Sequence, residues 1–173
     1  SRGLKVGNGL DAGVQQGPLI DDRAVTKVEE HIQDAVAKGA KVIAGGHRHA
    51  LGGTFFEPTV LTDVTPKMVV AREETFGPVL PIIRCPDDVE HIIAIANSTA
   101  FGLSAGLCTN RLDTITRFVD ALDVGCVNVW EVPGYRTELT PFGGIKDSGL
   151  GHKEGVLEAM KSFTNIKTYS LPW

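Results

Sequence analysis

Apolar residues recur at spacings of three and four in several stretches, which is the periodicity of a helix with one buried face. The segment that opens at Asp21 and ends before Gly39 shows it most clearly, so a helix is predicted there. Its apolar positions are Val25, Val28, Ile32, Ala35 and Val36. The same pattern predicts a helix that opens at Asp87 and ends within 97–101, and further helices at 112–122 and 152–160.

Short runs rich in β-branched and aromatic residues alternate with these helices and predict strands. The predicted strands are 41–44, 55–64, 68–71, 79–84, 103–107, 125–130 and 163–171. The run 125–130 is nearly continuous in its apolar residues, which is typical of a strand buried on both faces of a parallel sheet. Strands that alternate with helices indicate an α/β protein with a doubly wound, mostly parallel sheet.

Two motifs in the chain point to chemistry. Residues 73–78 are Glu-Glu-Thr-Phe-Gly-Pro, and residues 141–149 are Pro-Phe-Gly-Gly-Ile-Lys-Asp-Ser-Gly. Because the first motif follows the apolar run 68–71, Glu74 is expected at the carboxyl end of a strand, where open α/β sheets bind ligands. A carboxylate there would accept hydrogen bonds from a ribose. Taken alone, the acidic pair would indicate a solvated turn, and Phe76 a core residue.

The second motif lacks the frame of a phosphate-binding loop, in which Gly-Lys-Ser/Thr opens a helix. Its glycines instead allow the backbone to turn tightly and to approach neighbouring segments. We therefore expect the run from Pro141 to position its neighbours, with Phe142 as the side chain that contacts a ligand.

In order and separation, the two motifs resemble those of the aldehyde dehydrogenase family, and the resemblance covers the whole chain. It implies that the chain is the C-terminal portion of that family's catalytic domain. It also implies that Glu74 holds the nicotinamide ribose of NAD or NADP and that Phe76 packs beside the nicotinamide. The aldehyde site would be shaped by Trp130, Arg136 and Phe142.

The resemblance also indicates what the chain lacks. The family's nucleophilic cysteine, general-base glutamate and dinucleotide-binding domain all precede the segment that matches 17–20 here. In the family, the cysteine thiolate adds to the aldehyde carbonyl, hydride passes to the nicotinamide, and the glutamate activates water that hydrolyses the thioester. We therefore expect Ser1 to be an internal start, no catalytic residue within the chain, and no activity from the chain alone.

The loop 131–140 follows the predicted strand 125–130, at the end of a strand where specificity is expected. Arg136 lies in this loop, and a guanidinium at the mouth of an apolar tunnel needs an anionic partner. The substrate would supply that partner, or Arg136 would pair with Glu131 or Glu138 in the same loop.

Within the family, the loop 131–137 and the tail 161–173 resemble the members that oxidise phosphonoacetaldehyde. This implies a short anionic aldehyde whose phosphonate oxygens Arg136 would bind in bidentate fashion. One alternative is a dehydrogenase of the succinate semialdehyde or lactaldehyde type. Another is a non-catalytic assembly module that kept the fold without the chemistry.

Composition narrows the class of partner. The 173 residues are 42% hydrophobic and 22% charged, and 17 basic residues against 21 acidic ones give a formal charge of −4. The basic residues are dispersed, so no nucleic-acid surface is expected, and no apolar run is long enough to span a membrane. We expect a small-molecule aldehyde as partner and a cytoplasmic location.

The cysteines offer no clear chemistry. Cys85, Cys108 and Cys126 lie far apart, without Cys-x-x-Cys spacing or a matched histidine, so neither a metal site nor a disulfide framework is expected. Each lies in or beside an apolar run, which predicts buried and unreactive thiols. A standalone enzyme that uses Cys108 or Cys126 is the least favoured hypothesis, because neither has a candidate base nearby in sequence.

The last predicted strand has a distinct role in the resemblance. In the family it pairs with a sheet of a neighbouring subunit, which covers an edge that would otherwise promote aggregation. We therefore divide the chain into residues 1–162, the C-terminal part of the catalytic domain, and residues 163–173, a terminal oligomerisation strand. The whole protein is expected to be a homodimer or homotetramer.

Overall fold

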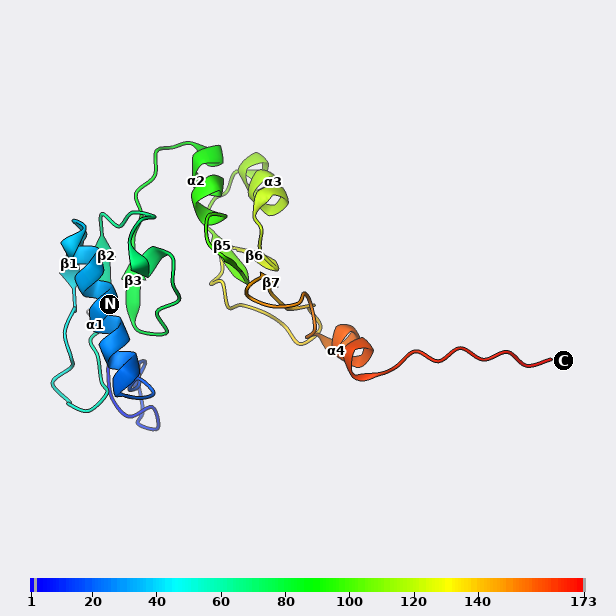
Figure 1. Cartoon of the computed structure of the whole chain (residues 1–173), viewed down its shortest axis with the longest axis horizontal. Helices are drawn as coiled ribbons and strands as arrows, with labels where there is room; N and C mark the ends of the chain where they lie inside the picture. Colours follow the sequence, from blue (N-terminus) through cyan, green and yellow to red (C-terminus); the bar gives the residue numbers. More distant parts are fainter. Residues whose placement is uncertain (2, 173) are drawn as a thin grey trace. The chain divides into compact units, whose positions relative to one another are not determined.

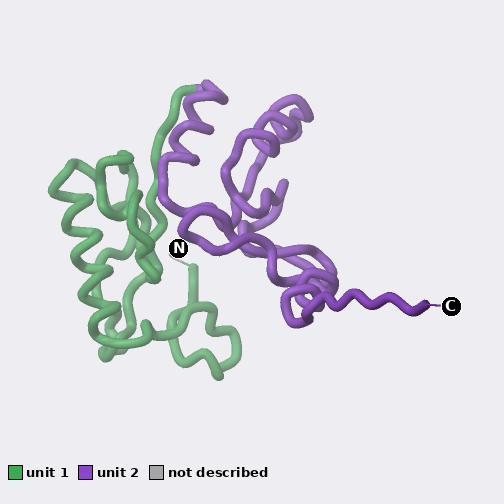
Figure 2. The backbone as a smooth tube through the Cα atoms, turned by 45° about the vertical axis from the view of Figure 1, so that its right-hand side comes forward, with its two compact units in different colours: residues 1–86 green, residues 87–173 purple. Residues whose placement is uncertain are grey.

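The computed structural model describes residue 1 and residues 3–172. The chain forms two compact units, Ser1–Pro86 and Asp87–Trp173, which have different colours in Figure 2. Each unit combines helices with short strands (Figure 1), which confirms the α/β class.

The first unit contains one long helix and a small mixed sheet. Its elements are α1 (Asp22–Ala37), β1 (Lys41–Ala44), β2 (Thr59–Thr62), the 3-10 helix η1 (Val69–Ala71) and β3 (Val79–Pro81). Strand β2 pairs with β1 in antiparallel fashion and with β3 in parallel fashion. Helix α1 begins as the sequence predicts, because the Asp21 carboxylate caps it by accepting the Ala24 N–H at 2.8 Å.

The core of the first unit joins the inner face of α1 to β2, to the segment after it and to η1. Its buried apolar residues are Val25, Val28, Ile32, Ala35, Ala40, Phe56, Leu61, Val64, Met68 and Val70. Most of the predicted helical stripe is therefore confirmed. Val36 is the exception, since it is exposed, and the polar His31 is buried on the inner face instead.

The strand predicted at 68–71 is wrong, because Val69–Ala71 form η1. The Met68 N–H donates to the Thr65 carbonyl and the Ala71 N–H to the Met68 carbonyl, each at 3.1 Å, which winds the segment into a turn. The carboxylate of Asp34 on α1 accepts the Val69 N–H at 2.8 Å and satisfies the start of that turn. Glu74 consequently follows a helical turn and not a strand.

The second unit alternates helices with very short strands. Its elements are α2 (Val89–Ala96), β4 (Phe101–Gly102), β5 (Ser104–Leu107), α3 (Leu112–Ala121), β6 (Cys126–Val129), β7 (Ile145–Lys146) and α4 (Val156–Phe163). Strands β5 and β6 are parallel and β4 and β7 antiparallel. The predicted strands 103–107 and 125–130 are thus found as β5 and β6, but β6 is half-buried along its length and not buried on both faces.

A single doubly wound sheet is not what the described part of the chain forms. It contains a mixed three-stranded sheet and two pairs of strands. The chain runs from β1 to β2 through a loop that contains no helix. Strands joined in this way pair in antiparallel fashion. Strands β4 and β7 are too short to extend a larger sheet.

Helix α4 begins later than predicted, at Val156. The backbones of Phe142 and Glu154 exchange hydrogen bonds of 3.1 and 3.0 Å in an antiparallel bridge, which holds Glu154 in an extended conformation. Residues 164–172 form neither helix nor strand and run on from α4 as an extended, exposed segment (Figure 1). The strand predicted at 163–171 is therefore not formed within this chain, whereas its pairing with another subunit and the division at 162/163 stay predictions.

The buried thiols expected from the sequence are wrong, since Cys108 is exposed and Cys85 and Cys126 are half-buried. The strands beside Cys108 and Cys126, β5 and β6, are themselves only partly covered, so an apolar run did not ensure burial. Among the helices described for residues 1 and 3–172, none is long and apolar enough to cross a membrane.

Candidate functional site

Glu74 and Phe76 lie in the turn 73–77, which connects η1 to β3. The Glu74 carboxylate is exposed, and no hydrogen bond or ion pair joins it to the rest of the described chain. The Phe76 ring is also open to solvent, with 77% of the residue exposed. Phe76 has a φ of 51°, in the left-handed region that a non-glycine residue adopts only where the surroundings impose it.

Helix α1 contacts this turn from the inside. The Lys27 ammonium donates to the Glu74 carbonyl, and the His31 ring nitrogen Nδ1 lies 3.0 Å from the Thr75 hydroxyl. Gly77 is so close to the helix that a Cβ there would lie 2.3 Å from the Val28 Cγ2 atom. The helical pattern indicates Val28 as a core residue but does not indicate Lys27 or His31, because their partners in the turn are remote in sequence.

The side chain of His31 is 5% exposed. Burial is the main cause that lowers its pKa, and the nearby Lys27 ammonium lowers the pKa further. The Glu73 carboxylate, 4.0 Å from the Nε2 atom, opposes this shift only in part. The lowered pKa favours the uncharged imidazole, whose hydrogen bond to Thr75 is one between neutral groups.

Trp130 stands at the start of the loop 131–140 in the second unit. Its φ of 58° is again left-handed, and its indole N–H donates to the Asn110 side-chain oxygen at 2.9 Å. The Trp130 backbone N–H continues the ladder of β6 by donating to the Leu107 carbonyl at 2.9 Å. The residue thus turns the chain out of the strand and into the loop.

Asn128 holds the first half of this loop, and sequence reasoning missed it. Its side-chain amide nitrogen lies 3.2 Å from the Val132 carbonyl oxygen, 3.1 Å from that of Pro133 and 3.1 Å from that of Tyr135. The signal that would have revealed it is a single amide in an otherwise apolar strand. Such a residue needs partners, and here the loop provides them.

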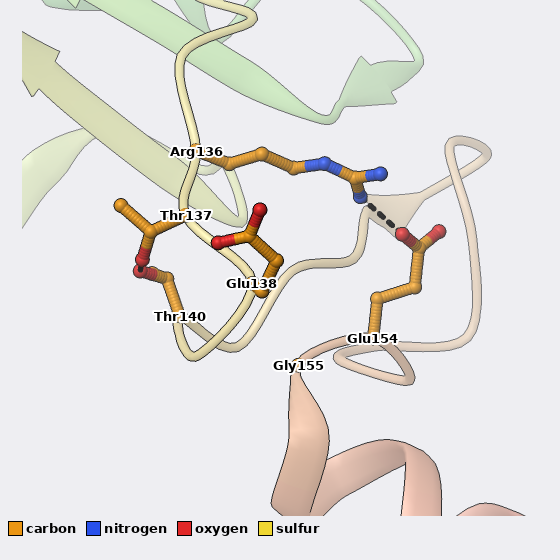
Figure 3. A pocket seen from close by; sticks show the side chains of 6 residues that line it. All are labelled: Arg136, Thr137, Glu138, Thr140, Glu154 and Gly155. Carbon is orange, nitrogen blue, oxygen red and sulfur yellow. Dashed lines mark hydrogen bonds and ion pairs between the residues drawn. The ribbon is translucent and has the colours of Figure 1, made fainter.

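Arg136 pairs with Glu154 and not with Glu131 or Glu138, the partners considered from the sequence. Figure 3 shows the guanidinium directed at the Glu154 carboxylate. The guanidinium carbon of Arg136 lies 4.8 Å from the centre of the Phe142 ring, within range of a cation–π contact. Arg136 and Phe142 are therefore in contact, and Glu154 completes a cluster that the sequence did not indicate.

A cavity of about 280 Å³ opens beside this cluster, lined by Arg136, Thr137, Glu138, Thr140, Glu154 and Gly155 (Figure 3). Both side chains of the ion pair remain about half exposed. The walls of the cavity carry charges of both signs, so the cavity suits a small polar molecule better than an apolar one.

The glycines of the second motif bring backbone segments into contact near Phe142. A Cβ on Gly143 would lie 2.1 Å from the Gly151 carbonyl oxygen, so no other residue fits there. Close approach explains this glycine, since its φ is not in the left-handed region.

The predicted site residues thus fall into two sets, each described within its own unit. Glu74 and Phe76 share the turn of the first unit. Arg136 and Phe142 meet in the second unit, where Trp130 is tied instead to Asn110.

A model of the aldehyde dehydrogenase family matches residues 1–169, nearly the whole chain. The chain belongs to the aldehyde dehydrogenase family. The site motifs of both units lie inside this match, so they are parts of one family sequence.

Individual relatives in the aldehyde dehydrogenase family are about half identical to the chain. The 3-sulfolactaldehyde dehydrogenase of Pseudomonas putida is 50% identical over 165 residues, which cover 95% of this chain and 33% of that protein. The succinate-semialdehyde dehydrogenase of Escherichia coli K12, named for NADP(+), is 48% identical over 164 residues, with coverages of 95% and 33%. The chain thus spans about a third of the length of these relatives.

Solved structures of the family match the fold as well. The crystal structure of an NADP-dependent enzyme of E. coli superimposes with a TM-score of 0.88 at 48% sequence identity, and the match covers 95% of this chain and 34% of that one. The arrangement of helices and strands is therefore that of the corresponding part of an aldehyde dehydrogenase.

Proposed function

We propose that the whole protein oxidises a short aldehyde with an anionic group at its far end to the carboxylic acid, using NAD or NADP. The observation that carries this proposal is Arg136, a half-exposed guanidinium held over Phe142 beside a polar cavity. Relatives named for succinate semialdehyde and 3-sulfolactaldehyde support it, because both aldehydes carry an anionic group.

The turn 73–77 fits a nicotinamide cofactor. Glu74 offers an exposed carboxylate, which suits the hydroxyl groups of a ribose, and Phe76 offers an exposed flat ring. When bound, the cofactor supplies the hydride acceptor for the oxidation. The residues of this chain orient the cofactor. Glu74 fixes the ribose, and Phe76 limits the positions that the nicotinamide ring can take.

Arg136 would bind the far end of the aldehyde. A guanidinium forms two parallel hydrogen bonds with a carboxylate, and such charge-assisted pairs are stronger than neutral ones. The guanidinium carbon of Arg136 lies 4.8 Å from the centre of the Phe142 ring, and this contact uses none of the hydrogen-bond donors of the guanidinium. The substrate's anion would take the place that Glu154 occupies in this structure.

Succinate semialdehyde is the substrate that the relatives favour. Phosphonoacetaldehyde, the first expectation from the sequence, becomes the second candidate. It keeps support from Arg136, since a guanidinium binds phosphonate as well as carboxylate oxygens, and from the relative that acts on a sulfonated aldehyde.

The nucleophilic cysteine and the general-base glutamate would be supplied by parts of the whole protein that precede this chain. A homodimer or homotetramer and a cytoplasmic location belong to the same proposal. The alternative of a non-catalytic assembly module predicts no binding of a nicotinamide cofactor.

The test is NAD(P) reduction by the complete protein with succinate semialdehyde, phosphonoacetaldehyde and the uncharged butanal. Arg136→Leu should raise the KM of the anionic aldehydes about tenfold or more, because a charged hydrogen-bond partner is lost, and leave butanal unchanged. Arg111→Leu is the matched control, since Arg111 is exposed and pairs with Asp113 at the start of α3. Oxidation of none of the three aldehydes, or equal losses on all three in Arg136→Leu, would refute the proposal.

A further inference from the structure

We propose that α1 sets the conformation of the turn 73–77, with His31 and Lys27 as positioning residues for Glu74 and Phe76; the catalytic consequence rests on the proposed role of that turn in cofactor binding. His31 is buried beneath the turn, and Lys27 donates to the turn's backbone. Each acts on the backbone or side chains of the turn.

The contacts from α1 to this part of the chain follow one face of the helix. Lys27 donates to the Glu74 carbonyl, and His31, four residues later, bonds the Thr75 hydroxyl. Further along the helix, Asp34 accepts the Val69 N–H at the start of η1. One helix face therefore holds both the segment that leads into the turn and the turn itself.

The burial of His31 shows that its role is specific. The neighbouring core positions of α1 are aliphatic, and burying an imidazole among them costs free energy unless it is hydrogen-bonded. The hydrogen bond that compensates this cost goes to Thr75, at 3.0 Å. A core histidine whose partner is the residue between Glu74 and Phe76 couples the core to the turn.

The turn is also fixed sterically. Gly77 packs directly on Val28, so the turn can approach the helix only with glycine at this position. Phe76 is held at a left-handed φ, a conformation that relaxes when its neighbours no longer impose it. The α1 contacts on either side of Phe76 restrain the turn, together with backbone hydrogen bonds at its two ends.

Loss of the His31–Thr75 bond should therefore let Glu74 and Phe76 move away from their productive positions. The effect should appear in hydride transfer and not in aldehyde binding, because the contacts proposed for the aldehyde belong to the loop 131–140. This separates a positioning role from a general loss of stability.

The direct test is hydrogen–deuterium exchange at the backbone amides of residues 73–77 in the complete protein. In His31→Leu these amides should exchange faster than in the native protein. In His31→Asn part of their protection should return, because the asparagine amide can place a polar atom near the position of Nδ1. Val25→Ala is the matched control, because Val25 is buried on the same helix but lies before the turn contacts. Unchanged exchange in His31→Leu, or equal acceleration in Val25→Ala, would overturn the proposal.

A second readout links the turn to chemistry. In a single turnover, His31→Leu should slow nicotinamide reduction about fivefold, the loss expected for one net hydrogen bond, with the aldehyde KM unchanged. A merely structural effect would lower the fraction of active enzyme and leave the rate of that fraction at the native value. Faster exchange with an unchanged rate would overturn the proposed role of the turn in hydride transfer, whereas unchanged exchange would overturn the role of α1.

Discussion

The turn 73–77 of the first unit and the loop 131–140 of the second are held in different ways. Helix α1 supports the turn, and the inner face of that helix belongs to a core of ten buried apolar residues. The loop is held at its start by hydrogen bonds from the single amide of Asn128. In the described part of the second unit, the buried hydrophobic residues are Ile93 and Phe118, both on helices away from the loop.

This difference matches the two tasks proposed for the segments. A cofactor is the same molecule in every turnover, so a turn fixed by the core suits it. A specificity loop changes between relatives with different substrates, and a loop held by few contacts can change without loss of the fold. In the proposed function, the turn supported by the core serves the cofactor and the loop with fewer contacts serves the substrate.

The largest effect should come from the core of the first unit. Leu61→Ala removes a fully buried side chain of β2 and should lower the free energy of unfolding by about 2–5 kcal/mol. Leu112→Ala is the matched change in the second unit, where the side chain is exposed, and should cost less than about 0.5 kcal/mol. Urea unfolding of the two variants measures both values, and similar costs would contradict the contrast between the units.

A smaller effect is expected from Gly77→Ala. The added methyl group would lie 2.3 Å from Val28 and should destabilise the first unit by about 1–3 kcal/mol, as overpacking does. It should also slow nicotinamide reduction, because the turn must move off the helix. Gly9→Ala is the control, since no atom lies near a Cβ at that position. If Gly77→Ala behaves like Gly9→Ala, the turn does not depend on its packing against α1.

Asn128→Ala should act on the loop and leave the core unaffected. It removes the side-chain amide that bonds the three loop carbonyls, with a net cost of about 1 kcal/mol. The KM of the complete protein for succinate semialdehyde should rise several-fold, because Arg136 follows the loosened segment. Asn110→Ala, which loses only the bond to the Trp130 indole, serves as control. The loop does not depend on Asn128 if the two variants have the same KM.

The smallest effect is a pH dependence. Burial lowers the pKa of His31, so between that value and the ordinary histidine value of about 6.5 the unfolded chain binds more protons than the folded one. Stability should therefore fall as pH is lowered through this range. The charged groups around the imidazole are Lys27, Glu30, Asp34 and Glu73.

His31→Asn isolates this contribution. The Lys38 ammonium is the main cause that lowers the pKa of Asp34, which places the titration of this neighbouring carboxylate at lower pH than the histidine range. Urea midpoints measured from pH 7.5 to pH 5.5 should decline less in His31→Asn than in the native protein. An identical decline in both would exclude His31 as its source.

The sequence predicted what local patterns determine. Helix α1 appears with Asp21 as its cap, and β5 and β6 appear at the predicted positions, because periodicity and boundary residues act within a few positions. The prediction was wrong where a residue remote in sequence determines the local conformation. Asp34 caps η1 from 35 residues away, and no local signal separates that apolar run from a strand.

The candidate site divides in the same way. Arg136 was marked by its charge in the predicted loop, but its partner Glu154 lies 18 residues further along the chain and was assigned to the start of a helix. His31 fell within a helical pattern whose neighbours are core residues, so its bond to Thr75 depends on the tertiary fold.

We infer that the first unit serves the cofactor and the second unit selects the aldehyde. Single-turnover nicotinamide reduction by the complete protein, with Glu74→Gln and Arg136→Leu compared on succinate semialdehyde and butanal, tests it most directly. Glu74→Gln should slow hydride transfer equally for both aldehydes while the nucleophilic cysteine stays reactive, and Arg136→Leu should weaken only the use of succinate semialdehyde. Unchanged turnover in Glu74→Gln, or equal losses on both aldehydes in Arg136→Leu, would contradict this division.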